Sequence, residues 1–185
     1  GGRTDLCKIY FGKKKNKKFS LKDLAKNQIK IRYYDIVSLY PYICSTGPYP
    51  VGKPEYIIHD FNYNLKHSNG KPYFGFIHCK ILPPQNLYHP VLGTTVRNKF
   101  IFPLCQKCAD EANSMNNCCH TEDERCLEDI WTTEEIKKAI ELGYKIKKIY
   151  MVIHYDQKST DLFTNYMNIF FYIKNKAEKE NNPGY

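Results

Sequence analysis

The sequence has no apolar run near the length of about 20 residues that a membrane-spanning helix needs, so no membrane partner is expected. It has no recognisable signal peptide and no internal repeat, which argues against a secreted protein and against a repeat array. Acids are in short supply, with 19 Asp and Glu against 28 Lys and Arg, for a net charge of +9. Such a surface suits a polyanion such as nucleic acid, although it also serves solubility alone.

The composition is that of a folded protein. The chain is 42% hydrophobic and 15% aromatic over 185 residues, which is enough for a core and excludes a disordered chain. It begins GGRT and ends NNPGY, so we expect a piece of a longer protein. Eight cysteines without a signal peptide predict an intracellular, reducing compartment, where clustered cysteines hold metal more often than they form disulfides. Nucleus, cytoplasm, organelle and viral factory are not distinguished.

Strands and helices are mixed along the chain without regular alternation, which predicts an α+β fold. Thr132 and Glu135 form a capping box that starts a helix, and Gly143 ends it. Glycine and proline between Pro41 and Pro54 are expected to interrupt regular structure. An amphipathic helix is expected over residues 161–180, with an apolar face of Leu162, Tyr166, Ile169, Phe170 and Ile173. Strands are expected at 1–12, 28–34, 73–82, 99–103 and 145–154.

One short stretch, RYYDIVSLYPYI at residues 32–43, places an acid at the end of an apolar run. Tyr34 and Ile36 are expected to be buried beside it. A carboxylate at the end of a buried strand is well placed to bind Mg²⁺, which prefers carboxylate and phosphate oxygens. The plainer interpretation is that Asp35 caps a turn and that Tyr40 is ordinary packing.

The segment DIVSLYP, residues 35–41, resembles motif A, D-x-x-S-L-Y-P, of family B DNA polymerases at every fixed position. Further segments are similar to the protein-primed branch, which includes viral, linear-plasmid and Polinton-type transposon polymerases. These segments are GPYPVGKPE, YFGFIHCKILPP, LYHPVL, FPLCQKCADE and CHTEDER. The resemblance spans nearly the whole chain and implies part of a polymerase palm, an antiparallel sheet with flanking helices, carrying a zinc-bearing insertion.

The resemblance also implies roles for individual residues. Asp35 would be the catalytic residue that binds Mg²⁺ in a two-metal site, and Ile36 would offer its backbone carbonyl to one metal. Ser38 and Leu39 would contact the incoming dNTP through backbone N–H groups. Tyr40 would pack under the deoxyribose and exclude a 2′-hydroxyl. The expected partners are therefore a DNA template-primer and dNTP, with a terminal protein supplying the priming hydroxyl.

The cysteine-rich segment predicts a zinc site. Cys105 and Cys108 form a C-x₂-C pair, and a further cysteine and His120 follow, which are suitable ligands for tetrahedral Zn²⁺. The resembling polymerases carry C-x-H at this place, which favours Cys118 as the third ligand. Cys119 and Cys126 remain as substitutes. With all four positions filled, the metal would be structural. The alternative is that the cysteines are small buried residues and the histidine is exposed.

We expect three segments: 1–60 as the first palm segment with motif A, 61–130 as an insertion at the terminal-protein-contacting position with the zinc loop at 105–120, and 131–185 as a helix–strand–helix leading back towards palm and fingers. The family's second acidic motif, D-T-D, does not occur in the sequence. We therefore expect a fragment of a DNA-directed DNA polymerase that is inactive by itself. The alternatives are a non-catalytic zinc module that binds nucleic acid or protein, and a decayed relic of a selfish element.

Overall fold

The structure is a computed structural model that describes residues 34–36, 38–112 and 117–180. The chain divides into two compact units, residues 1–39 and 40–185. The strands expected at 1–12 and 28–34 lie outside the described residues. The helices are α2 (Leu39–Thr46), α3 (Gln106–Asp110), α4 (Glu122–Arg125), α5 (Thr133–Glu141) and α6 (Thr164–Lys179). The strands are β1 (Tyr49–Val51), β2 (Glu55–Ile57), β3 (Gly75–Leu82), β4 (Thr94–Val96), β5 (Lys99–Ile101), β6 (Leu127–Thr132), β7 (Lys145–His154) and β8 (Gln157–Ser159).

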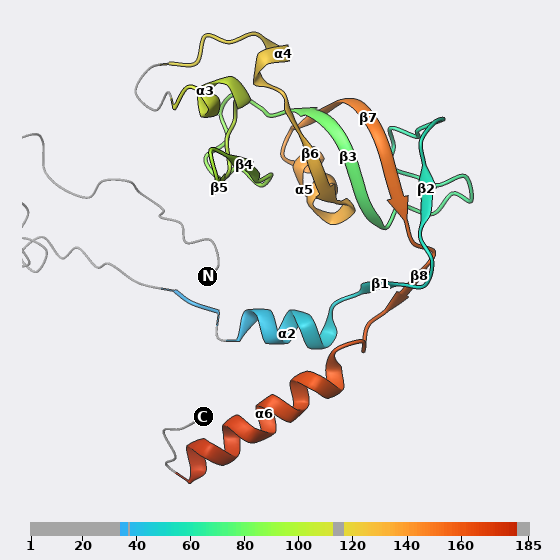
Figure 1. The fold of residues 1–185 in the computed structure, drawn as a ribbon, viewed down its shortest axis with the longest axis vertical. Helices are drawn as coiled ribbons and strands as arrows, with labels where there is room; N and C mark the ends of the chain where they lie inside the picture. The colour runs from blue at the N-terminus through green and yellow to red at the C-terminus, as the bar shows by residue number, and fades with distance from the viewer. Residues whose placement is uncertain (1–33, 37, 113–116, 181–185) are drawn as a thin grey trace, which may run out of the picture. The chain divides into compact units, whose positions relative to one another are not determined.

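A four-stranded antiparallel sheet in the order β2-β7-β3-β6 is the centre of the larger unit (Figure 1). Strands β1 and β8 form a separate antiparallel ribbon, and β4 and β5 form a hairpin. The predicted α+β fold is confirmed, as are the strands predicted at 73–82, 99–103 and 145–154. The strands of this sheet come from all three expected segments, and β6 crosses the expected boundary at residue 130. Among the described residues, no helix has the length and apolarity to span a membrane.

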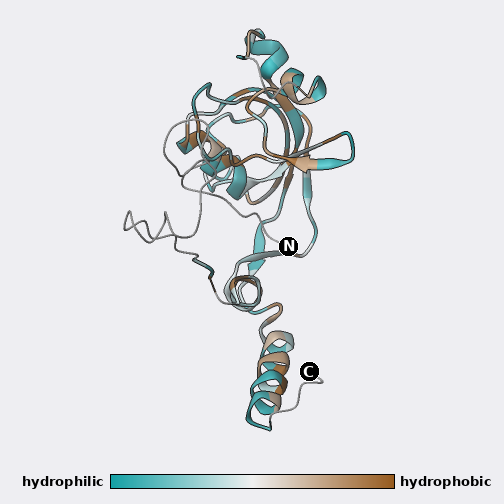
Figure 2. Cartoon of the chain, turned by 90° about the vertical axis from the view of Figure 1, so that its left-hand side faces the viewer, coloured by the Kyte–Doolittle hydropathy of each residue, from teal (hydrophilic) through white to brown (hydrophobic). Residues whose placement is uncertain are grey.

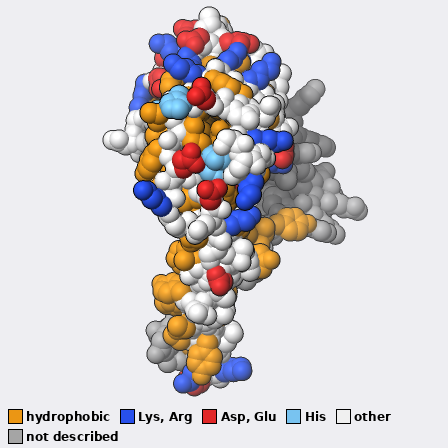
Figure 3. Space-filling view, turned by 90° about the vertical axis from the view of Figure 1, so that its right-hand side faces the viewer, with side chains coloured by type: hydrophobic (Ala, Val, Ile, Leu, Met, Phe, Trp, Pro, Cys, Tyr) orange, Lys and Arg blue, Asp and Glu red, His pale blue; other side chains and the backbone are white. Residues whose placement is uncertain are grey.

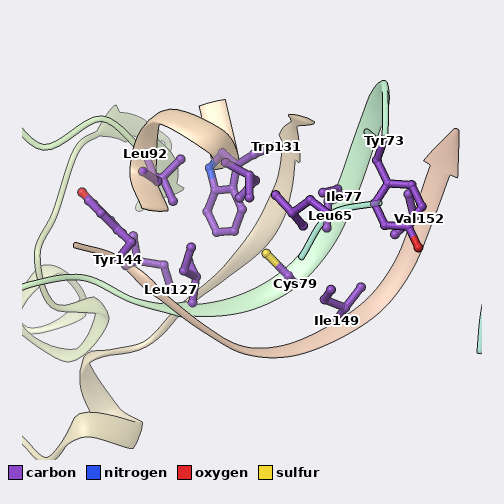
Figure 4. Close-up of a cluster of buried hydrophobic side chains, with 13 residues drawn as sticks. Leu65, Tyr73, Ile77, Cys79, Leu92, Leu127, Trp131, Tyr144, Ile149 and Val152 are labelled. Atoms are coloured by element: carbon purple, nitrogen blue, oxygen red, sulfur yellow. The ribbon is translucent and has the colours of Figure 1, made fainter. Parts of the chain in front are cut away.

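The core lies on the face of the sheet that α5 covers. Alternate residues of β3 are buried, and Ile77 pairs with Trp131 of β6 and with Val152 of β7 on this face. Ile136 of α5 is fully buried in the same cluster. Figure 4 shows the clustered side chains and Figure 2 the hydrophobic residues along the sheet. The two-residue period of β3 and the helical period of α5 therefore converge on one apolar layer.

Local signals fix the ends of α5 and the start of β3. The predicted capping box is present, because Thr132 Oγ1 accepts from the Glu135 N–H and the Glu135 carboxylate accepts from the Thr132 N–H. Gly143, with a φ of 91°, follows the helix in the left-handed region. Gly75 has a φ of 140°, and a Cβ there would lie 2.1 Å from the Ile153 carbonyl oxygen, so only glycine fits.

The ribbon of β1 and β8 connects the sheet to helices α2 and α6 (Figure 1). The ends of α2 and α6 next to this ribbon are in contact. Thr164 Oγ1 donates to the Ser45 carbonyl oxygen at 2.7 Å, and the rings of Tyr49 and Phe163 meet edge-on at 5.0 Å. The C-terminal end of α2, the helix that begins with the last residues of DIVSLYP, therefore meets the N-terminal end of α6.

Several expectations were wrong, although the predicted C-terminal helix is present from Thr164 onwards. Of its residues, all of which the structure describes, only Ala177 is buried. Of its predicted apolar face, Tyr166, Ile169 and Phe170 are exposed, Ile173 is half-buried, and Leu162 lies before the helix. Figure 3 shows hydrophobic side chains along this part of the molecule. Pro41 lies inside α2 and Pro50 inside β1, so neither interrupts regular structure. The first turn of a helix tolerates proline, because its N–H groups have no partner in the helix. Tyr34 and Ile36 are exposed, not buried.

Candidate metal centre and catalytic segment

Asp35 stands just before α2, in a described stretch without regular structure, and its side chain is exposed. The chain turns sharply after it. Ser38 has a φ of 56°, and the Leu39 N–H donates to the Ile36 carbonyl oxygen at 3.2 Å. Tyr40, in the first turn of α2, is 61% exposed. One exposed carboxylate supplies one of the oxygen ligands that Mg²⁺ needs, so phosphate, water or other residues must supply the rest.

The four residues predicted to bind zinc come from the starts of two short helices. Cys105 is the N-cap of α3, and its sulfur accepts from the Cys108 N–H at 3.3 Å. His120 precedes α4, whose N-cap Thr121 and Glu124 form a second capping box. These local hydrogen bonds fix the backbone at Cys105 and next to His120. Cys105 and His120 are therefore positioned by helix-capping turns although the segment is polar.

The structure brings the predicted ligands together. The sulfurs of Cys105, Cys108 and Cys118 and a ring nitrogen of His120 all lie within 4.8 Å of one another. His120 Nδ1 is 3.4, 3.3 and 3.7 Å from these three sulfurs in turn. A tetrahedral zinc ion with Zn–S of about 2.3 Å and Zn–N of about 2.0–2.1 Å separates sulfur from nitrogen by about 3.5 Å. The donor set and its spacing therefore fit zinc.

A fifth residue, which the sequence analysis missed, faces this cluster from the other side of the imidazole. Glu111 Oε2 lies 3.4 Å from His120 Nε2, and the His120 side chain is only 12% exposed. A carboxylate on the second ring nitrogen holds a metal-binding histidine in one tautomer and orientation. Glu111 follows Cys108 by three residues, but no spacing rule relates it to a histidine nine residues later.

The thiols of the cluster have unequal proton affinities. A hydrogen bond from the His120 backbone is the main cause that lowers the pKa of Cys118 to about 7. Desolvation, followed by hydrogen bonds with Cys105 and Cys118, raises the pKa of Cys108 to about 12. Desolvation also raises the pKa of Cys105. Three thiols this close cannot all ionise unless a cation balances their charge, which is what a divalent metal provides.

The two substitute ligands lie apart from the cluster. Cys119 is exposed and outside the group of converging ligand atoms, although it adjoins both Cys118 and His120 in sequence. Cys126 is buried, and its sulfur donates to the Glu122 carbonyl oxygen at 3.2 Å. Geometry therefore favours Cys118 as the third sulfur.

Residues 16–185 match the family described as DNA polymerase type B, organellar and viral. A protein of Neurospora intermedia described as a probable DNA polymerase is 25% identical over 158 residues. That alignment covers 82% of this chain but 14% of the relative, so the chain corresponds to a small part of that protein. No solved structure matches the chain.

Proposed function

Because the chain belongs to the organellar and viral type B DNA polymerase family, we propose that it is a palm segment of a longer DNA-directed DNA polymerase. The whole enzyme would join dNTPs to a primer 3′-hydroxyl or to a hydroxyl of a terminal protein. The observation that carries the proposal is DIVSLYP at residues 35–41, which lies at the entry to α2 within the family match over 16–185.

The proposed chemistry needs two divalent cations, and this chain supplies part of their site. Asp35 would bind both Mg²⁺ ions through its carboxylate, with the Ile36 carbonyl as a further ligand. Ser38 and Leu39 would contact the triphosphate, and Tyr40 would select the deoxyribose. The metals would stabilise the attacking and leaving oxygens of the in-line phosphoryl transfer. The second acid must come from outside the chain, so we propose that the isolated chain does not synthesise DNA.

The Cys/His cluster has a proposed role that is separate from catalysis. Cys105, Cys108, Cys118 and His120 would hold a structural Zn²⁺, since all four positions come from the protein and none is left for a substrate. We propose that this loop belongs to the insertion, residues 61–130, that docks the terminal protein in protein-primed synthesis. The support is the position of the segment after motif A.

Primer extension tests the catalytic proposal. The complete reading frame that contains this chain should extend a DNA primer, and Asp35→Asn should reduce the rate by about 10³-fold, equal to about 4 kcal/mol of transition-state stabilisation. Asp60→Asn is the matched control, because the Asp60 side chain is 95% exposed and asparagine tolerates its φ of 53°. Equal activity of the two variants would show that Asp35 is not an active-site residue.

A second function, a non-catalytic zinc module that binds nucleic acid or protein, is favoured by one observation. The Cys/His cluster is complete within the chain, whereas the proposed catalytic site is not. This function predicts binding that depends on the metal and does not depend on Asp35. Three results together would support this second function. Cys105→Ser should lose binding to nucleic acid or protein, Asp35→Asn should keep it, and the complete reading frame should not extend a primer.

A further inference from the structure

Arg125 is a buried cation at the base of the cysteine-rich loop. It is the last residue of α4 and is only 5% exposed, whereas arginine is seldom buried unless its charge is paired. Its guanidinium donates to the Pro83 carbonyl oxygen at 2.8 Å and to the Leu104 carbonyl oxygen at 3.4 Å. Pro83 follows β3, and Leu104 precedes the ligand Cys105. One side chain therefore ties the loop that carries the cluster to the end of the central sheet, where Figure 1 shows α3 and α4 together.

Arg125 has no acidic partner in the part of the chain that the structure describes. None of the carboxylates there lies within ion-pair distance of its guanidinium. A hydrogen bond from Lys147 is the main cause that lowers the pKa of Glu122, and Arg125 is a lesser one. Each acid of α4 has another partner, which is Lys147 for Glu122, Lys80 for Asp123 and the Thr121 N–H for Glu124. A buried charge that nothing balances is strongly destabilising, so the charge that balances Arg125 lies elsewhere.

The metal-loaded cluster supplies a negative charge of the right size. Three thiolates exceed the charge of a divalent ion by one, and a neutral imidazole adds none, so the loaded cluster is a monoanion. Arg125 reaches it through the Leu104 carbonyl, which belongs to the peptide that leads into Cys105. Both Arg125 and Cys105 are buried, so solvent screens their charges less than at the surface. The acid beside the cluster, Glu111, has its own cation, because Lys107 lies 3.7 Å from it.

We propose that Arg125 is a positioning residue of the metal centre, both the counter-charge of the loaded cluster and the link between its loop and the sheet. The bound metal gives the buried guanidinium an anion, and the guanidinium in turn stabilises the negatively charged cluster. Loss of the metal leaves an unbalanced cation at the end of β3, so metal binding and the stability of the sheet are coupled. The inference rests on the proposed metal-binding role of the cluster and on no part of the catalytic proposal.

Two substitutions separate the charge of Arg125 from its hydrogen bonds. Arg125→Lys keeps the charge and loses the fork of N–H groups, whereas Arg125→Gln keeps an N–H donor and loses the charge. Zinc affinity of the complete 185-residue chain, measured by competition with a chelator, should fall by less than about threefold in Arg125→Lys and by about 10- to 100-fold in Arg125→Gln, as for other residues that support metal ligands. A role in hydrogen bonding alone predicts equal losses or the reverse order.

The reactivity of the metal-bound sulfurs is a second readout, which hydrogen bonding to a distant carbonyl does not move. A neighbouring cation lowers the nucleophilicity of a thiolate. At saturating zinc, Cys105 should therefore react with iodoacetamide several-fold faster in Arg125→Gln than in the parent protein or Arg125→Lys, as followed by mass spectrometry of the peptide that contains it. Equal rates in all three proteins would contradict the assignment of Arg125 as the counter-charge.

Arg97→Gln is the matched control, because Arg97 also donates to a carbonyl of the same loop, that of Asp110, but is exposed. Its zinc affinity should match that of the parent protein, and a loss equal to that of Arg125→Gln would overturn the proposal. If Arg125→Gln does not fold by circular dichroism, Arg125→Lys decides alone, since a tenfold loss despite the retained charge overturns the proposal and a smaller loss supports it. A parent chain that binds no zinc would overturn the metal site itself, whereas zinc binding that is equal in both Arg125 variants would overturn only the role of Arg125.

Discussion

The different pKa values of the thiols in the cysteine cluster predict how many protons are released when a metal binds. At pH 8, a thiol with a pKa of about 7, such as Cys118, is about 90% ionised, whereas Cys108, with a pKa of about 12, is protonated. Cys105, with its raised pKa, is also counted as protonated. Zinc binds thiolates, so binding at pH 8 should release about two protons, one each from Cys105 and Cys108.

Substitution makes the prediction specific to each sulfur. Cys108→Ser should lower the release to about one proton, because a protonated ligand has been removed. Cys118→Ser should leave it near two, because the lost ligand carried almost no proton. Cys119→Ser, outside the cluster, is the matched control and should behave as the parent protein.

Isothermal titration of zinc into the metal-free protein, in buffers of different ionisation enthalpy, measures the released protons. As protons compete with zinc for the thiols, affinity should also rise with pH. Release of three protons by the parent protein, or equal losses in Cys108→Ser and Cys118→Ser, would refute the assignment of charge to Cys118.

Three further predictions concern the supporting structure. Glu111→Gln should weaken zinc binding about 10- to 100-fold in a chelator competition, since it orients the ligand histidine, whereas Glu178→Gln on α6 should not; equal affinities would refute this. Ile136→Ala should lower the free energy of unfolding by about 2–5 kcal/mol in urea titrations, because this side chain is fully buried. Ile140, which is 40% exposed, should lose less than about 1 kcal/mol when changed to Ala. The reverse order would contradict the packing of the Ile136 face of α5 on the sheet. Gly75→Ala should cost about 3 kcal/mol or more, because the φ and the carbonyl contact both exclude a Cβ; an unchanged urea midpoint would contradict the geometry.

Features encoded in short stretches of sequence were predictable. Strands 73–82 and 145–154 and the Thr132 capping box depend on alternation and on a spacing of three residues, and the structure contains them all. The four residues of the Cys/His cluster were also predicted, Cys105, Cys108 and His120 from their spacing and Cys118 from the C-x-H of the resembling polymerases. Metal-binding pairs such as C-x₂-C lie within one turn of chain, so local geometry already limits where their side chains point.

Features that depend on distant surroundings were not predictable. The stripe of α6 has helical period, but periodicity does not say what covers a face, and here Tyr166, Ile169 and Phe170 of that face are exposed. Glu111 was missed because its contact with His120 depends on the path of the intervening chain. Pro41 was expected to interrupt regular structure because proline ends helices in general, whereas the first helical turn accepts it.

The position of β7 in the sheet has a consequence for biosynthesis. This strand lies between β2 and β3 but is made long after both, and Glu55 pairs with His154 from the far part of the chain. Contacts between residues so distant in sequence form slowly, because a long loop must close first. On the ribosome, β3 can pair only with β6 until residues 145–154 emerge, and one side of it stays open. The nascent chain is therefore exposed to misassembly and to chaperone capture over this interval, and a truncation before β7 leaves the sheet unable to close.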